Sequence, residues 1–238
     1  MDVRLLNSTP QPERAIAAAA RVCYAPVGAA ELMETMSDEE VRKILRIIMT
    51  SGHLSALEHA SFTFAIDGVS RAMTHQLVRH RIASYNQQSQ RYVSYDEPTF
   101  IVPPVIEADE QVRERFLTAC QEAFGSYRSL LDAGIPAEDA RYLLPNAMET
   151  KIVVTMNIRE LLHFFSLRSC RRAQWEIRAV SDRMLELVAP VAPYIFMDAG
   201  AACLRGPCPE GKMSCGEPFE RRTRPGEASA DATTDETQ

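Results

Sequence analysis

Two short β-rich segments each run directly into a helical pattern, and this repeated strand-to-helix order restricts the possible folds. Residues 61–67 (SFTFAID) alternate polar and apolar side chains as a strand does, and we expect Gly68 to end that strand. A helical pattern follows over about 70–81. Residues 151–156 (KIVVTM) are again rich in β-formers and precede a second helical pattern over 158–168. We therefore expect an α+β fold in which several helices pack around a small sheet.

Local capping signals mark two helices best. Ser37 and Glu40 have the spacing of a capping box, and the apolar positions that follow predict a helix over 38–51 that ends at Gly52. Asn157 is a suitable N-cap for the helix over 158–168. The remaining expected helices begin at Pro12, run over 107–134, begin at Pro136 and run over about 172–189.

Composition and charge exclude several classes of protein. The 238 residues are 46% hydrophobic and 24% charged, which excludes collagen-like, low-complexity and wholly disordered chains. No apolar stretch approaches the roughly 18 to 20 residues of a membrane span, and the N-terminus has no export signal. The net charge of −6 argues against a general nucleic-acid binder. We expect a soluble cytoplasmic protein whose six cysteines are thiols, because they are too sparse for a disulfide scaffold.

The C-terminal part of the chain differs in composition from the rest. Cys203, Cys208 and Cys215 lie among glycines and prolines, but their spacing fits no common zinc pattern, so we favour free thiols over a metal site. The last residues are rich in Ser, Thr, Ala and acid. We therefore divide the chain into a main domain over 1–202, a cysteine-bearing segment over 203–216 and a disordered acidic tail over 217–238.

The clearest candidate site lies in residues 79–92 (RHRIASYNQQSQRY). The chain has neither a Rossmann fingerprint nor a P-loop, so any phosphate must be bound by side chains. Arg79 and Arg81 flank an imidazole at a predicted helix end, and a loop rich in amides and hydroxyls leads to Arg91. Such a loop can bind phosphate and read the edge of a base. The alternative is that Arg79 and Arg81 only compensate a helix dipole and stay solvated.

A second cluster lies on the helix predicted over 158–168. Arg159 and His163 are four positions apart, so they share a face and could address one ligand. Taken alone, His163 could instead be a buried core histidine. Arg168 could likewise form only a surface ion pair with Glu160 or Glu176.

Cys170 is a candidate nucleophile. Arg168, Arg171 and Arg172 lie beside it in the sequence, and positive charge favours the thiolate. The alternative, a small and partly buried helical residue, suits the pattern about as well.

The spacing Arg79-His80-Arg81-x7-Ser89 resembles the Arg-His-Arg-x7-Ser signature of the flavin-dependent thymidylate synthases. The resemblance continues through 52–59, 62–64, 140–145, 157–159, Arg168 and 173–177, and so covers most of residues 1–200. It implies a small antiparallel sheet packed with several helices, and a catalytic domain over 1–202 that binds FAD and deoxyuridylate (dUMP). It also implies a homotetramer that converts dUMP to dTMP, with methylenetetrahydrofolate as carbon donor and NADPH-reduced FAD as hydride source.

The resemblance assigns roles position by position. Matches to positions that hold FAD are Ser55, Arg79, His80, Arg81, Gln87, Asn157, Arg159 and His163. Matches to the dUMP pocket are His75, Gln76, Leu77, Val78, Arg79, Gln87, Gln88, Ser89, Gln90, Arg91, Arg141 and Arg168. Among these, Arg168 matches the catalytic arginine that activates the uracil ring. Some relatives have Glu at the position of Gln87 and Asn at that of His163, and both replacements keep hydrogen-bonding ability.

Two other functions stay open at this point. An RNA- or single-strand-binding module could use the same basic loop, with Tyr85 and Tyr92 as stacking surfaces. A flavin reductase without methyl transfer would share the flavin site but not the dUMP chemistry.

Overall fold

A four-stranded antiparallel sheet lies at the centre of the structure, a computed structural model that describes residues 1–93 and 97–220. Its strands, in spatial order, are β1 (Asp2–Ser8), β2 (Ser61–Ser70), β4 (Glu149–Asn157) and β3 (Ala83–Gln87). Every neighbouring pair is antiparallel. The predicted fold class, a small antiparallel sheet packed with several helices, is confirmed.

Alternation along β2 and β4 builds the core. Phe62, Phe64 and Ile66 are fully buried on one face of β2. Their register partners in β4 are Met156, Val154 and Ile152. Burying one such side chain stabilises the fold by about 1.5–3 kcal/mol, so these paired positions contribute strongly to its stability. On the opposite face, the hydroxyls of Thr63 and Thr155 lie 2.9 Å apart in a hydrogen bond between the strands.

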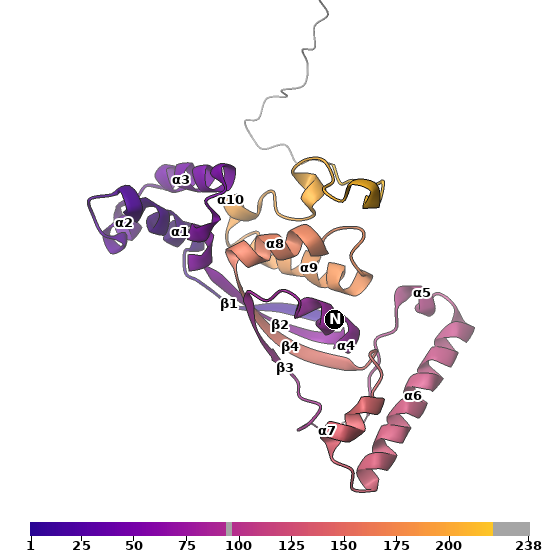
Figure 1. The fold of residues 1–238 in the computed structure, drawn as a ribbon. Helices are drawn as coiled ribbons and strands as arrows, with labels where there is room; N and C mark the ends of the chain where they lie inside the picture. The colour runs from indigo at the N-terminus through magenta and orange to yellow at the C-terminus, as the bar shows by residue number, and fades with distance from the viewer. Residues whose placement is uncertain (94–96, 221–238) are drawn as a thin grey trace, which may run out of the picture.

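Two helices cover one face of the sheet. Figure 1 shows α8 (Ile158–Arg168) and α9 (Trp175–Val188) over the strands. Phe196, in α10 (Pro193–Phe196), packs edge-on against Phe62, with ring centroids 5.9 Å apart, and against Phe165 of α8 at 6.0 Å. These aromatic contacts join the sheet, α8 and α10 in one core.

Three helices near the N-terminus pack beside that core. They are α1 (Pro12–Arg21), α2 (Ala29–Thr35) and α3 (Asp38–Ser51). The predicted capping box is present at the start of α3: the Ser37 hydroxyl accepts from Glu40 N–H, and the Glu40 carboxylate accepts from Ser37 N–H at 2.8 Å. Gly52 ends α3 with φ 74°, a left-handed conformation that glycine adopts easily. The predicted helix over 38–51 is confirmed.

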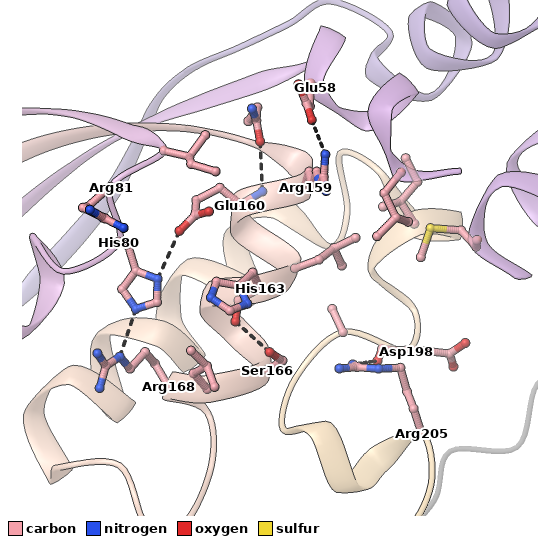
Figure 2. Close-up of a pocket in the computed structure, with 18 of the residues that line it drawn as sticks. Glu58, His80, Arg81, Arg159, Glu160, His163, Ser166, Arg168, Asp198 and Arg205 are labelled. Carbon is pink, nitrogen blue, oxygen red and sulfur yellow. Dashed lines mark hydrogen bonds and ion pairs between the residues drawn. The ribbon is translucent and has the colours of Figure 1, made fainter. Parts of the chain in front are cut away.

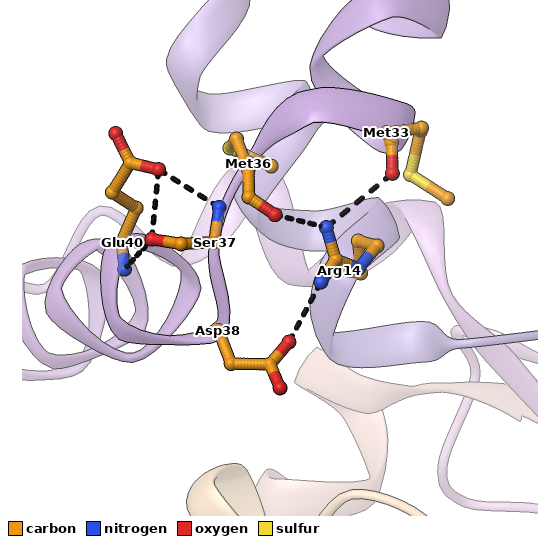
Figure 3. Close-up of polar contacts among 6 residues, drawn as sticks. All are labelled: Arg14, Met33, Met36, Ser37, Asp38 and Glu40. Carbon is orange, nitrogen blue, oxygen red and sulfur yellow. Dashed lines mark hydrogen bonds and ion pairs between the residues drawn. The ribbon is translucent and has the colours of Figure 1, made fainter.

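Arg14 fastens α1 to the beginning of α3 (Figure 3). Its guanidinium donates to the carbonyls of Met33 and Met36 and pairs with the Asp38 carboxylate at 2.7 Å. These contacts satisfy carbonyls at the end of α2, so a single side chain joins three helices.

The β2–α4 junction differs from the expectation. Gly68 does not end the strand; it occupies a bulge with φ 68°, and β2 continues to Ser70. The following helix, α4 (Arg71–Leu77), ends before Arg79 instead of reaching Arg81. Alternation alone could not reveal the bulge, because one extra residue shifts the period without removing the strand.

The sequence patterns predict neither β1 nor β3. Residues 83–87 (ASYNQ), expected as a loop, pair with β4. Tyr85 lies in β3, and its single hydroxyl proton is shared between the carbonyls of Leu77, at 2.9 Å, and His80, at 2.7 Å. The turn that carries Arg79, His80 and Arg81 is therefore anchored to the sheet at both ends.

A helical lobe extends away from the sheet (Figure 1). It contains α5 (Pro104–Glu107), α6 (Glu110–Asp132) and α7 (Ala137–Ala140). The single helix predicted over 107–134 is thus interrupted at Asp109, whose carboxylate caps α6. The lobe has its own small core, formed by Phe124, Tyr127, Ala140 and Met148.

The cysteine-bearing segment folds back onto the domain. Its short 3-10 turns are Ala202–Leu204 and Gly211–Met213. Arg172 donates to the carbonyl of Met213, which ties the segment to the turn before α9. Of the tail expected over 217–238, residues 221–238 lie outside the described residues. Within the described ranges, none of the helices has the length and apolarity needed to cross a membrane.

A buried carboxylate in α9 supports the start of α4. Glu176 accepts from the Ser70 N–H at 2.7 Å and from the Ser70 hydroxyl at 2.5 Å, and both residues are buried. The same hydroxyl accepts from Met73 N–H as the N-cap of α4.

We predict that Glu176→Ala lowers the free energy of unfolding by about 1–3 kcal/mol, because it leaves two buried donors of Ser70 without a partner. Glu186→Ala is the matched control: it lies on the exposed side of the same helix and should change stability by less than about 0.5 kcal/mol. Urea denaturation measures both. Equal effects of the two substitutions would contradict this role for Glu176.

Candidate functional site

A cavity of about 910 Å³ opens between α8, the turn after α4 and the segment that follows α10 (Figure 2). Six of the eight residues predicted to hold FAD line it: Arg79, His80, Arg81, Asn157, Arg159 and His163. Arg168 lines it as well. Five of the lining side chains are guanidinium groups and three are carboxylates, so the cavity favours an anionic ligand.

The junction between β4 and α8 places several of these groups. Asn157 ends the strand and caps the helix, since its side-chain oxygen accepts from Glu160 N–H at 2.9 Å. Arg159 and His163 follow one turn apart, and both face the cavity as their spacing predicted. Arg159 also pairs with Glu58 at 2.5 Å, a contact that is half exposed to solvent.

His80 lies between a carboxylate and a guanidinium. Its Nδ1 is 3.1 Å from Glu160 Oε1, and its Nε2 is 3.0 Å from Arg168 Nε. The Arg168 Nε–H can only donate, so Nε2 of a neutral imidazole must accept and the single ring proton must sit on Nδ1. Nδ1–H then donates to Glu160. The three side chains thus form one directed chain of hydrogen bonds, visible in Figure 2.

Burial sets the protonation states in this chain. Burial, together with the nearby positive charge of Arg168 and the His163 ring, lowers the pKa of His80 from 6.5 to about 4. Burial also raises the pKa of the Glu160 carboxyl above its usual value and lowers that of Arg168. Near neutral pH His80 is therefore uncharged, and its contact with Glu160 is a hydrogen bond to a carboxylate, not an ion pair.

The alternatives for the second cluster do not match the structure. His163 is exposed to solvent and lines the cavity, so it is not a core histidine. Arg168 is half-buried and donates to His80 instead of forming a surface pair with Glu160 or Glu176. Glu176 is buried and bonded to the start of α4.

The other predicted flavin residues lie outside this cavity. Ser55 is exposed on the 3-10 turn Leu54–His59. Two other residues of this turn, Leu54 and Glu58, do line the cavity. Gln87 is half-buried, and its side-chain amide donates to the hydroxyls of Thr74, at 2.9 Å, and Thr150, at 3.4 Å.

The predicted dUMP residues fall into two separate groups. His75, Gln76, Leu77 and Val78 form the end of α4 and the residue after it. Leu77 is fully buried, and its carbonyl already accepts from the Tyr85 hydroxyl and from His80 N–H, so neither its side chain nor its backbone is open to a ligand in this chain. Of the whole dUMP set, only Arg79 and Arg168 line the cavity.

The second group of predicted dUMP residues, 88–91 and Arg141, lies next to α7. Residues 88–91 follow β3, where Arg91 pairs with the Glu138 carboxylate at 2.6 Å. The Arg141 Nε–H donates to the Glu138 carbonyl at 3.1 Å. The fold thus brings Arg91 and Arg141 together at Glu138, away from the cavity.

Sequence reasoning missed Glu160 and Arg205. The sequence marks Glu160 only as a possible surface partner of Arg168, whereas in the structure its side chain hydrogen-bonds to His80. Arg205 lies in the cysteine-bearing segment, donates to the Asp198 carbonyl at 2.9 Å and lines the cavity. No local pattern marks either role, because both depend on contacts that the fold creates.

The thiols give no sign of a metal centre. All six cysteines are unpaired, and within residues 1–93 and 97–220 no group of three His, Cys, Asp or Glu side chains is arranged to hold a metal ion. Cys170, Cys203 and Cys208 line a smaller pocket beside Arg168 and Arg172. Cys170 itself is half-buried.

Tyr85 does not fit the nucleic-acid alternative. Its ring packs against the core and its hydroxyl is used by two carbonyls, so it cannot stack on a base. Tyr92 is 81% exposed, so of the two tyrosines only Tyr92 is exposed enough to stack on a base.

Comparison with known proteins identifies the family. Residues 4–194 match the family described as Thymidylate synthase complementing protein. The flavin-dependent thymidylate synthase of Geobacter sulfurreducens is 60% identical over 222 residues, covering 92% of this chain and 96% of that protein. That of Clostridium tetani is 49% identical over 236 residues, covering 92% and 95%. The chain therefore belongs to the family of flavin-dependent thymidylate synthases, and the resemblance predicted from the Arg-His-Arg signature is confirmed.

A solved structure shares the fold. The UMP/dUMP methylase PolB from Streptomyces cacaoi, crystallised with 5-Br dUMP, superposes with a TM-score of 0.73 at 30% sequence identity. The match covers 82% of this chain and 93% of PolB.

We predict that His80 gives stability a distinct pH dependence. Because its pKa is lower in the folded protein, at about 4, than the ordinary 6.5, the unfolded chain binds a proton more readily between these values. The contribution is fully present above pH 6.5 and is lost as pH falls toward 4, by roughly 3 kcal/mol in all. The raised pKa of Glu160 acts with the opposite sign and offsets part of this loss.

Urea denaturation from pH 7 to 4 measures the effect as the difference in slope between wild type and His80→Asn. The wild-type free energy of unfolding should fall more steeply with acid. His53→Asn, at an exposed histidine, is the control and should keep the wild-type slope. A wild-type slope in His80→Asn would contradict the buried neutral imidazole.

Proposed function

We propose that this protein is a flavin-dependent thymidylate synthase that methylates dUMP to dTMP in the cytoplasm. FAD is its cofactor, methylenetetrahydrofolate supplies the carbon and NADPH the reducing equivalents. The observation that carries the proposal is the meeting of the Arg79-His80-Arg81 signature with Arg168 in one cationic cavity, in a chain of this family.

The cavity suits FAD in both size and chemistry. Its volume of about 910 Å³ lies within the usual range for small-molecule sites. FAD carries a diphosphate and a uracil-like ring edge, and guanidinium groups beside amides suit both. Arg79, Arg81 and Arg159 are exposed side chains that could meet the phosphates. The exposed pair of Arg159 with Glu58 is worth at most about 1 kcal/mol, so Arg159 can exchange that partner for a ligand.

We assign FAD binding to Ser55, Arg79, His80, Arg81, Gln87, Asn157, Arg159 and His163. When bound and reduced, FAD supplies hydride to ring position 6 of the pyrimidine. The assigned residues would hold the edges of the flavin and pyrimidine rings and would exclude water from around them.

Arg168 is the proposed catalytic residue. Hydride addition at ring position 6 would leave negative charge on the uracil ring, and a fixed guanidinium at the edge of the ring would stabilise it. The hydrogen bond to His80 uses only the Nε–H of Arg168, so its two terminal NH₂ groups can face the substrate. The side chain is half-buried, where such an interaction is stronger than in water.

We propose a homotetramer whose dUMP sites are completed by a second subunit. Arg79 and Arg168 line the cavity, whereas Arg91 and Arg141 gather at α7 in the same chain. A neighbouring copy would bring its own α7 group to the cavity. The remaining dUMP contacts we assign to residues 75–78 and 87–90.

We predict that Arg168→Lys folds, binds FAD and oxidises NADPH, but forms dTMP roughly 100- to 1,000-fold more slowly. Lysine keeps the charge but offers one flexible donor in place of a planar fork, and loss of one positioned donor costs about 2.7–4 kcal/mol. The measurement is single-turnover conversion of dUMP by the pre-reduced enzyme, after flavin occupancy has been checked. Arg183→Lys, on the exposed side of α9, is the control. A wild-type rate in Arg168→Lys would remove the assigned role.

We predict that light scattering gives the mass of a homotetramer for the FAD-bound protein. Arg141→Ala and Arg168→Ala should each be inactive alone, and co-expression should restore part of the activity, because some sites then receive both arginines from different chains. A monomer that still binds FAD tightly would exclude the proposed assembly. Mixed tetramers without activity would place both arginines on one subunit.

A further inference from the structure

We propose that Glu160 is a positioning residue, which orients the guanidinium of Arg168 through the His80 ring. The inference rests on the proposed function, because it gives Glu160 a task in the reaction assigned to Arg168. Glu160 would touch neither substrate nor reacting atoms.

The three side chains come from two elements that face one another. Glu160 lies in the first turn of α8 and Arg168 in its last turn, while His80 lies in the turn between α4 and β3 (Figure 2). The His80 ring fills the space between them, 3.1 Å from the Glu160 carboxylate and 3.0 Å from Arg168 Nε. The Tyr85 hydroxyl holds the carbonyl of His80, so the backbone of this turn is fixed as well.

Packing leaves the ring little freedom to rotate. The ring of His80 lies edge-on to Phe164, with centroids 4.9 Å apart, and 5.8 Å from the ring of His163. Phe164 is fully buried and belongs to the core. With the ring plane held, the remaining variable is which nitrogen carries the proton.

Glu160 determines which ring nitrogen of His80 carries the proton. If its carboxylate accepts from Nδ1–H, Nε2 is left as an acceptor and holds Arg168 Nε–H. Without an acceptor at Nδ1, the proton can move to Nε2, where it would face the donor of Arg168. Two donors repel, so the guanidinium would lose its fixed orientation. Neighbouring acceptors set the tautomer of metal-bound histidines in the same way.

The His80 ring is the partner of the Glu160 carboxylate in the described part of the chain. The Glu160 side chain is only 6% exposed, and burying a charge is costly unless hydrogen bonds compensate it. The start of α8 does not need it, because the Asn157 side chain already caps the helix. Charged and titratable groups near the ring are Glu160, Arg168 and His163 of α8, Tyr85 of β3 and the flanking Arg79 and Arg81.

Glu160→Leu tests the proposal, because leucine fills similar space and removes the acceptor. In the FAD-bound, pre-reduced enzyme we expect single-turnover dTMP formation to fall roughly 10- to 100-fold, with flavin occupancy and the KM for dUMP within about twofold of wild type. The amide oxygen of Glu160→Gln can still accept a hydrogen bond, so its single-turnover rate should lie between those of the wild type and Glu160→Leu. Glu186→Gln, on the exposed side of α9, is the matched control and should keep the wild-type rate.

A double-mutant cycle separates positioning from general structural damage. In the Arg168→Lys background, Glu160→Leu should change the rate by less than about twofold, because the guanidinium that it orients is already gone. Full multiplication of the two losses would overturn the proposal, as would a wild-type rate in Glu160→Leu. If Glu160→Leu does not fold, the same cycle with Glu160→Gln decides by the same criterion.

The cycle also separates this proposal from the proposed function. A wild-type enzyme that binds FAD but forms no dTMP would refute the function itself. An active wild type with an unaffected Glu160→Leu would refute only the positioning role.

Discussion

The hydrogen bond between the Asn157 side chain and Glu160 N–H fixes where β4 stops and α8 starts. β4 is the strand between β2 and β3, so this end point is held by pairing on both sides. From it, the helical repeat alone directs Arg159 and His163 to the cavity and places Arg168 at the far end of the helix. A shift of one residue at this junction would turn all of them away from the cavity.

Burial divides the Arg-His-Arg signature into two environments. The guanidinium groups of Arg79 and Arg81 are in solvent, where they can attract and bind anions, whereas His80 between them is 4% exposed. Only the central residue is held by the core, through Phe164 and the Tyr85 hydroxyl. The same tripeptide thus combines an electrostatic surface with a rigid, neutral hydrogen-bonding group, which neither residue type would provide alone.

The parts of this fold that sequence could predict are those with local signals. The helices over 38–51 and 158–168 were predicted with their correct ends because Ser37 and Asn157 cap them directly. β3 was missed because its sequence is mostly polar and only pairing with β4 makes it a strand. The family resemblance pointed to most of the residues that line the cavity. It did not point to the contact between His80 and Glu160, which joins positions 80 apart and follows from no periodicity.

The lobe formed by α5, α6 and α7 has its own small hydrophobic core, separate from the much larger core around the sheet. The two cores therefore stabilise their parts of the molecule unequally. Arg91 is linked to this lobe through Glu138, and Arg141 belongs to it, so the lobe and not the main core positions both arginines. Opening of a small core costs less free energy than opening of the main one. In the proposed assembly, a nucleotide held by these arginines and by the cavity of a neighbouring copy would connect the lobe of one chain to the main body of another, and bound substrate would protect the lobe from transient opening.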